Sequence, residues 1–115
     1  MESPSPPRPT ARLVVAALLR RCHAHGTPAF QVVRGDPDAG TVFIKLNGLA
    51  RGCVVLAPVR DGQGQAAWLR ATGPEPVDET VADAYLDRQR RTDPDLWVVE
   101  VEDPALTPPV DAPVL

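Results

Sequence analysis

The residues of this 115-residue chain whose types and spacing best suit ligand binding are arginines. Arg88 and Arg91 are three positions apart in a predicted helix, so their side chains share one face of it. Arg70 lies in a predicted strand, and Arg20 and Arg21 end another predicted helix. If the fold brings Arg88, Arg91 and Arg70 to one cleft, they form a site for a small anion. The alternative is that the arginines cap helix ends and pair with nearby aspartates, where each surface pair contributes only about 0–1 kcal/mol.

The residues of metal-ligand type are Cys22, His23, His25 and Cys53. Neighbouring helical residues point about 100° apart, so Cys22 and His23 do not face one ion. Cys22, His25 and Cys53 would supply only three ligands, whereas structural zinc sites show two paired motifs with fixed spacing. Both cysteines also lie in apolar stretches, where thiols are usually inert. We therefore expect no metal and no other cofactor.

Residues for nucleophilic or acid–base catalysis are scarce. The only serines, Ser3 and Ser5, lie in a proline-rich tail, so no Ser-His-Asp constellation can form in the core. Asp36 and Asp38, in GDPDAG, are explained by a tight turn, because a calcium loop would continue with further oxygen ligands. Lys45 is expected to face away from the core. No catalytic residue is predicted, and the balance of these patterns is against an enzyme without excluding one.

Net charge and hydropathy exclude two classes of partner. The formal net charge is −3, which argues against a nucleic-acid binder, since such proteins usually carry a basic patch. The apolar run Leu13–Leu19 is much shorter than the roughly 20 residues that a membrane span needs. It also lacks the features of a signal peptide. We therefore expect a cytoplasmic protein with reduced cysteines and no membrane partner.

The hydropathy pattern predicts a single α+β domain. Residues 11–103 form the domain, and the proline-rich tails 1–10 and 104–115 are expected to be disordered. We expect an antiparallel sheet of about five strands with two helices on one face, in the order α-β-β-β-β-α-β. The predicted elements are a helix over Leu13–His25, strands over Ala29–Arg34, Thr41–Leu46, Cys53–Ala57 and Ala67–Ala71, a helix over Asp78–Arg91 and a strand over Leu96–Val101.

Alternation along the strands separates expected core residues from expected surface residues. Trp97 shares a strand face with Val99 and Val101, and we expect that face to meet the second helix. Phe43 lies on the opposite side of its strand from Val42, Ile44 and Leu46, and Trp68 shares a strand face with Arg70. Phe43 and Trp68 are therefore candidate interface residues, because aromatic side chains are enriched in protein interfaces.

Three stretches of the chain resemble one known family. They are LVVAALLRRC early, GDPDAGTVFIKLNGL in the middle, and WLRATGPEPV followed by YLDRQRRTDPDLWVVEVED late. Together they resemble the small bacterial proteins grouped as domain of unknown function 1491, over nearly all of residues 11–103. The resemblance implies no activity, because that family has none assigned, and it transfers no catalytic residue.

These patterns favour a small non-enzymatic binding or protein-interaction domain that uses an exposed sheet face or an edge strand. Its partner would be another protein or a second copy of the chain. The alternative is a small-anion-binding domain or enzyme that uses Arg88, Arg91 and Arg70. A cleft with convergent polar groups would favour the alternative, and a flat apolar patch would favour the interaction domain.

Overall fold

The computed structural model describes residues 9–115 and confirms an α+β fold with two helices and a five-stranded sheet. Each predicted element is present in the predicted order, with its ends shifted by a few residues. The elements are α1 (Ala11–Ala24), β1 (Ala29–Val33), β2 (Val42–Asn47), a short 3-10 helix (Leu49–Arg51), β3 (Cys53–Arg60), β4 (Ala66–Arg70), α2 (Glu79–Thr92) and β5 (Trp97–Glu102).

The sheet is mixed, which corrects the expectation of a purely antiparallel one. The strand order is β1-β5-β2-β3-β4, and β5 runs parallel to β2 while the other three pairings are antiparallel. After β4 the chain crosses back through α2, and β5 then enters the sheet between β1 and β2. Only β2, β3 and β4 therefore form a meander.

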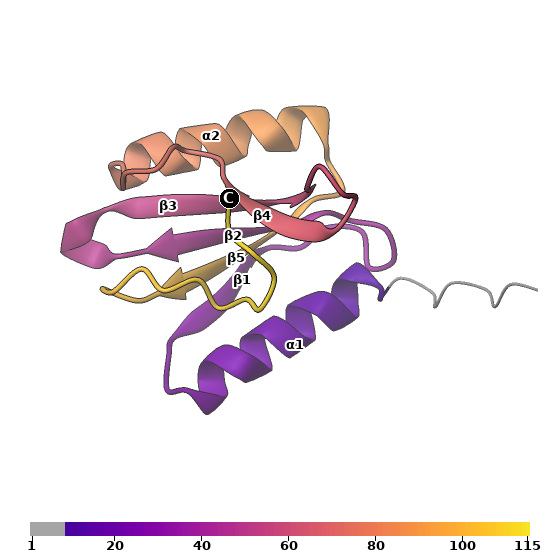
Figure 1. Cartoon of the computed structure of the whole chain (residues 1–115), viewed down its shortest axis with the longest axis horizontal. Helices are drawn as coiled ribbons and strands as arrows, with labels where there is room; N and C mark the ends of the chain where they lie inside the picture. The colour runs from indigo at the N-terminus through magenta and orange to yellow at the C-terminus, as the bar shows by residue number, and fades with distance from the viewer. Residues whose placement is uncertain (1–8) are drawn as a thin grey trace, which may run out of the picture.

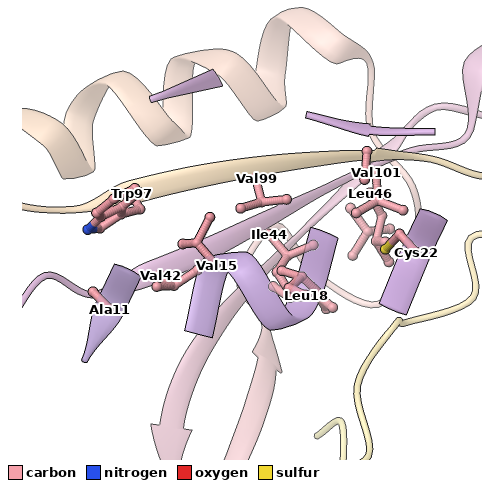
Figure 2. Packing of buried hydrophobic residues seen from close by; sticks show 13 residues of the cluster. Ala11, Val15, Leu18, Cys22, Val42, Ile44, Leu46, Trp97, Val99 and Val101 are labelled. Carbon is pink, nitrogen blue, oxygen red and sulfur yellow. The ribbon is translucent and has the colours of Figure 1, made fainter. Parts of the chain in front are cut away.

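The two helices cover opposite faces of the sheet, so the expectation that both lie on one face is wrong. Figure 1 shows α1 on the side of β1 and α2 on the side of β3, with the sheet between them. Figure 2 shows the α1 side, where Val15 and Leu18 pack on Ile44 and Val99. On the α2 side, Leu86 packs with a different set that includes Val55 and Val98.

Burial of β2 on both faces explains why the one-face expectation failed. All six residues of β2 are buried, with Val42, Ile44 and Leu46 toward α1. Alternation of apolar and polar residues is typical of a strand with one solvent-facing side, but a strand with a parallel neighbour usually has both faces covered. Lys45 made the second face of β2 look exposed, although helix α2 covers it.

Trp97 is a principal core residue, as predicted, but it meets the other helix. Its side chain is 2% exposed and packs in the cluster that contains Ala11 and Val15 of α1. Its indole N–H donates to the carbonyl oxygen of Asp36 at 2.7 Å, which ties β5 to the loop between β1 and β2. That loop approaches the chain before β5 so closely that a Cβ on Gly35 would lie 2.0 Å from the Asp95 carbonyl oxygen.

The C-terminal segment, defined as residues 104–115, packs on the body, which corrects the expectation of a disordered tail. Leu106, Val110 and Val114 contact the α1-side core. The Trp68 N–H donates to the Pro113 carbonyl oxygen, and the Leu115 N–H donates to the Trp68 carbonyl oxygen. These bonds place the end of the segment, residues 113–115, along the outer edge of β4. Of the N-terminal tail, residues 1–8 lie outside the described part of the chain.

Candidate functional site

A buried lysine bound by three carboxylates is the most unusual feature of the α2 side. Lys45, on β2, is 5% exposed. Its Nζ lies 2.7 Å from Asp83 Oδ1, 2.8 Å from Glu79 Oε2 and 3.2 Å from Glu100 Oε1. Asn47 completes the group, because its Nδ2 donates to both Glu79 and Glu100. The expectation that Lys45 faces solvent is therefore wrong.

The electrostatics of this group keep the lysine charged. Burial alone would lower the pKa of Lys45, but the hydrogen bonds with Asp83, Glu79 and Glu100 outweigh it and raise the pKa above its ordinary value. A nucleophilic or imine-forming lysine needs the neutral amine at working pH, so Lys45 is unsuited to that chemistry. Its position joins α2 to β2 and β5, and it acts as an ionic staple for that helix.

The sequence did contain a signal for this staple. Glu79 and Asp83 are four residues apart and so share one face of α2. Lys45 is the only lysine in the chain and sits in its clearest strand. An acidic pair on a helix that crosses such a strand is a reason to expect a buried pairing, and the sequence analysis did not make that connection.

The predicted arginine site is not assembled. Arg70 is paired with Leu56 across β4 and β3, and Leu56 belongs to the α1-side core, so Arg70 projects toward the α1 face. Arg88 and Arg91 lie exposed on α2, on the other face of the sheet. Arg21, on α1, forms an ion pair with Asp111 of the C-terminal segment at 2.9 Å. Arg88, Arg91 and Arg70 therefore do not line a common cleft.

The two predicted interface aromatics also lie on opposite faces. Phe43 is only 7% exposed, because α2 covers it and its ring lies 6.4 Å from that of Tyr85. The expectation that Phe43 is exposed is wrong. Trp68 is partly buried at the margin of the α1-side core and lines a cavity of about 530 Å³.

The two cysteines cannot share a metal ion, because they too lie on opposite faces. Cys22 belongs to the α1-side core, and Cys53 belongs to the α2-side core. Burial raises the pKa of both thiols. Within residues 9–115, no group of three or more His, Cys, Asp or Glu side chains has the arrangement of a metal site. Asp36 makes the predicted turn, since its Oδ1 accepts from the N–H groups of Asp38 and Ala39 at 2.9 Å each.

An open groove remains on the α2 side of the sheet, because α2 packs mainly on β3 and leaves β1 uncovered. Its floor includes Val32 and Val98, and its volume is about 290 Å³. Phe30 extends the floor outward, since its register partner Glu100 faces the groove. Phe30 is 49% and Val32 is 50% exposed.

Charged side chains form the wall of the open groove. Asp83 and Asp87 of α2 line it together with Glu100, and the cations are Arg90 and Lys45. Because three carboxylates already bind Lys45, the groove presents mainly negative charge beside Arg90. An apolar floor with an acidic wall can hold an apolar group next to a cation.

The fold and this arrangement define a small single-domain α+β protein whose second helix is held by a buried lysine beside an open groove. A family model described as "Protein of unknown function (DUF1491)" matches residues 10–111. This chain belongs to that family. No curated protein matches the sequence.

Solved structures agree with this assignment. A crystal structure of a DUF1491 family protein from Caulobacter crescentus CB15 has a TM-score of 0.84 and 31% identity, over 94% of this chain and 100% of that one. An NMR structure of a DUF1491 family protein from the same organism gives 0.78 and 32%, over 92% and 96%. The solution structure of Atu0922 from A. tumefaciens gives 0.68 and 28%, over 84% and 86%.

Neither α1 nor α2 combines the length and the hydrophobicity that a membrane-crossing helix requires.

Proposed function

We propose that this chain is a protein-interaction domain that binds a segment of another polypeptide in the open groove. The observation that carries the proposal is the pair of half-exposed apolar residues, Phe30 and Val32, on the uncovered side of β1 beside an acidic wall. Isolated surface hydrophobics are ordinary, but neighbouring ones rimmed by charge are typical of interaction sites. The proposal also places the domain in the cytoplasm, which its two buried free thiols support.

Charge indicates the chemistry of the partner. Asp83 and Asp87 project from α2 over the groove, and both are exposed. Complementary charge across an interface speeds association and rejects wrong partners. We therefore infer a partner segment that carries at least one Lys or Arg next to apolar side chains, with the cation against Asp83 and Asp87 and the apolar groups on Phe30 and Val32.

The edge of β1 argues against binding by strand addition. The Glu102 N–H donates to the Pro28 carbonyl oxygen, and ladder alternation then turns the backbone groups of Ala29 and Gln31 outward. The Ala29 carbonyl oxygen is already hydrogen-bonded to His23 Nε2, at a distance of 3.2 Å between the two atoms. A bulge between Gln31 and Val33 further interrupts the edge. Bulges and covered groups are how proteins block edge pairing, so the partner is expected to lie over the groove rather than beside β1.

Selection from a library of random dodecapeptides displayed on phage tests the proposal. Enriched peptides should combine Lys or Arg with apolar residues. Their affinity should fall at least tenfold for a Phe30→Ser/Val32→Ser variant and for an Asp83→Asn/Asp87→Asn variant. The matched control is Leu13→Ser, which removes a 58% exposed leucine from α1 and should leave binding unchanged. The proposal fails if no peptide is enriched, or if enriched peptides bind all these variants equally.

A further inference from the structure

The outer edge of β4 is the second edge of the sheet, and the proposed function does not use it. The strand order places β4 at one end of the sheet and β1 at the other. Unlike β1, β4 pairs with its neighbour in an unbroken register, and such an edge is a template for a further strand. Residues 113–115, which we call the edge cover, run parallel to β4 beside Trp68.

Three backbone hydrogen bonds hold the edge cover on β4. The Trp68 N–H donates to the Pro113 carbonyl oxygen at 2.8 Å, and the Leu115 N–H donates to the Trp68 carbonyl oxygen at 2.7 Å. The Arg70 N–H donates to the Leu115 carbonyl oxygen at 3.4 Å. A parallel ladder would continue with a bond from residue 113 to the Ala66 carbonyl oxygen. Pro113 has no N–H, so that bond cannot form.

The chain that leads to the edge cover is held loosely. No residue of the C-terminal segment is buried. Residues 108–112 make no backbone–backbone hydrogen bond to the described part of the chain. Asp111 pairs with Arg21, but the two side chains are 93% and 39% exposed, and pairs so exposed contribute little stability. The attachment of the edge cover therefore depends on a few partly buried contacts.

We propose that the β4 edge is a strand-addition site for a segment of another polypeptide, and that the edge cover is exchanged for that segment. Residues 107–115 leave the body together, while Leu106 stays in place because its side chain packs closely on Gly48. In strand addition, main-chain bonds supply affinity and alternate side chains supply specificity. The closed cover lowers the apparent affinity for the partner by the fraction of molecules in which the edge is open.

The edge cover itself indicates the chemistry of the partner. Val114 contacts the α1-side core, so the partner segment needs an apolar side chain at that position. An acidic residue three positions earlier would replace Asp111 beside Arg21. A residue other than proline at position 113 would add the missing donor for the Ala66 carbonyl oxygen.

The tether of the edge cover favours a different polypeptide over a second copy of this chain. A second copy offers the same residues and gains no contact, whereas the attached segment acts at an effective concentration of about 1 mM. A different segment can gain the bond that Pro113 lacks. This inference does not depend on the open groove, which lies over β1 at the other edge of the sheet.

Amide hydrogen exchange in the full chain tests whether the edge cover opens. The Ala71 N–H donates to the Val55 carbonyl oxygen, on the inner side of the same strand end. After correction for intrinsic rates, the Trp68 N–H should exchange roughly tenfold faster than the Ala71 N–H, because local opening precedes global unfolding. Equal rates would mean that the cover leaves only when the whole domain unfolds, and the proposal would be wrong.

Peptide binding to the full chain tests the exchange itself. An Asp111→Asn/Val114→Ser variant has a loosened cover, and unchanged Val98 signals would show that its core is intact. A peptide of residues 107–115 with Pro113→Ala should shift the Trp68 backbone N–H signal. It should bind this variant roughly tenfold more tightly than the parent, and more tightly than the unaltered peptide does.

Three controls define the outcome of the peptide test. The same peptide with Val114→Ser should not bind, Leu13→Ser protein should behave as the parent, and Phe30→Ser/Val32→Ser in the loosened variant should leave binding unchanged. Equal affinity for the parent and the loosened variant, or no binding to either up to about 1 mM, overturns the proposal. If no peptide binds and the parent instead dimerises as its concentration rises, the edge serves a second copy of this chain and the proposal of a separate partner is wrong.

Discussion

The two faces of the sheet are each half covered by a helix, and they differ in what happens to the other half. On the α1 face, the C-terminal segment packs on the core through Leu106, Val110 and Val114, and its end pairs with Trp68 at the edge of β4, near the cavity of about 530 Å³ that Trp68 lines. On the α2 face, the region over β1 has no such cover in residues 9–115, and Phe30 and Val32 stay half exposed. The α1 face is therefore covered further by the C-terminal segment, whereas the α2 face keeps exposed apolar residues over β1 in the groove that we propose for binding.

The faces also differ in charge. The buried cluster on the α1 face consists of apolar side chains (Figure 2), whereas the α2 face buries Lys45 and Asn47. A buried ion pair adds little net stability compared with apolar packing, because desolvation offsets the attraction. The α1 face, which has the larger apolar cluster, should thus contribute more to the folding free energy, and the ion pairs of Lys45 should hold α2 in place next to the groove.

Truncation of Trp97 is the strongest test of the expected difference in stability between the two faces. Trp97→Ala should lower the free energy of unfolding by about 3–5 kcal/mol, the range for removal of a large buried aromatic. Much of the total stability of a domain this small would then be lost. Urea denaturation should show Trp68→Ala to be milder, since Trp68 is only partly buried. The reverse ranking would mean that the α1-side core is centred on β4 and not on β5.

The cover on the α1 face can be tested by replacing Leu106, Val110 and Val114 with serine in the full chain. Because all three are partly buried, the combined loss should be about 2–4 kcal/mol, from a full-burial value of roughly 1.5–3 kcal/mol each. Thermal unfolding should move down by at least 10 °C or so, at roughly 4–8 °C per kcal/mol. The control, Ala105→Ser/Leu115→Ser, changes exposed positions of the same segment and should shift it little. Equal effects would show that the segment does not stabilise the body.

The charged staple on the α2 face should matter less than either change. Lys45→Met keeps the volume but leaves Glu100, whose side chain is only 16% exposed, without its cation. We expect a loss of about 1–3 kcal/mol, below the roughly 3–5 kcal/mol for a fully buried pair, because Glu79 and Asp83 are about half exposed. Urea denaturation of Lys45→Met, Glu100→Gln and the double variant should reveal positive coupling. Strict additivity would show that Lys45 and Glu100 do not act as a pair.

The sequence predicted the elements well and their layering poorly, for one physical reason. Helix caps, prolines and alternation are local signals, and they placed α1, α2 and all five strands. Which face a helix covers depends on the crossover that inserts β5 beside β2, and no local signal reports that. Lys45 is an example, because the strand pattern alone predicts that it faces solvent, whereas in the structure α2 covers it. Likewise, proline content made residues 104–115 look unstructured, although their three spaced apolar residues reach the core.

The predicted arginine site failed for a related reason. Arg88 and Arg91 do share a helix face, but Arg70 belongs to the opposite side of the sheet. Spacing within one element predicted a shared face correctly, and convergence between elements required the topology. The acidic pair Glu79 and Asp83 had the same spacing signal as Arg88 and Arg91. Of these two pairs, only Glu79 and Asp83 contact an oppositely charged residue on a strand, which is Lys45 of β2.

The smallest predicted effect is the loss of the Lys45 contribution to stability at alkaline pH, and it tests the ion pairs of Lys45 most directly. The folded-state pKa of Lys45 is raised above the unfolded value of about 10.4. Its contribution to stability is therefore complete below that pH and is lost as pH rises through the folded pKa. The stability difference between the parent and Lys45→Met should be constant from pH 7 to 9 and shrink by about 1 kcal/mol or less by pH 11, because one pH unit corresponds to 1.36 kcal/mol.

Urea denaturation of the parent and Lys45→Met side by side at each pH makes this measurement. Burial also raises the pKa of Tyr85 and Cys53, so both proteins should lose stability at high pH. The difference between them cancels the Tyr85 contribution. Because Lys45 lowers the pKa of Cys53, a Cys53→Ala change in both proteins removes that thiol from the comparison. The assignment is clean because Lys45 is the only lysine in the chain. A difference that already falls between pH 7 and 9 would mean that the carboxylates do not hold Lys45 protonated. The contribution of Lys45 to stability would then be smaller than its three short contacts with Asp83, Glu79 and Glu100 indicate. The α2 face would then be stabilised mainly by apolar packing, as the α1 face is.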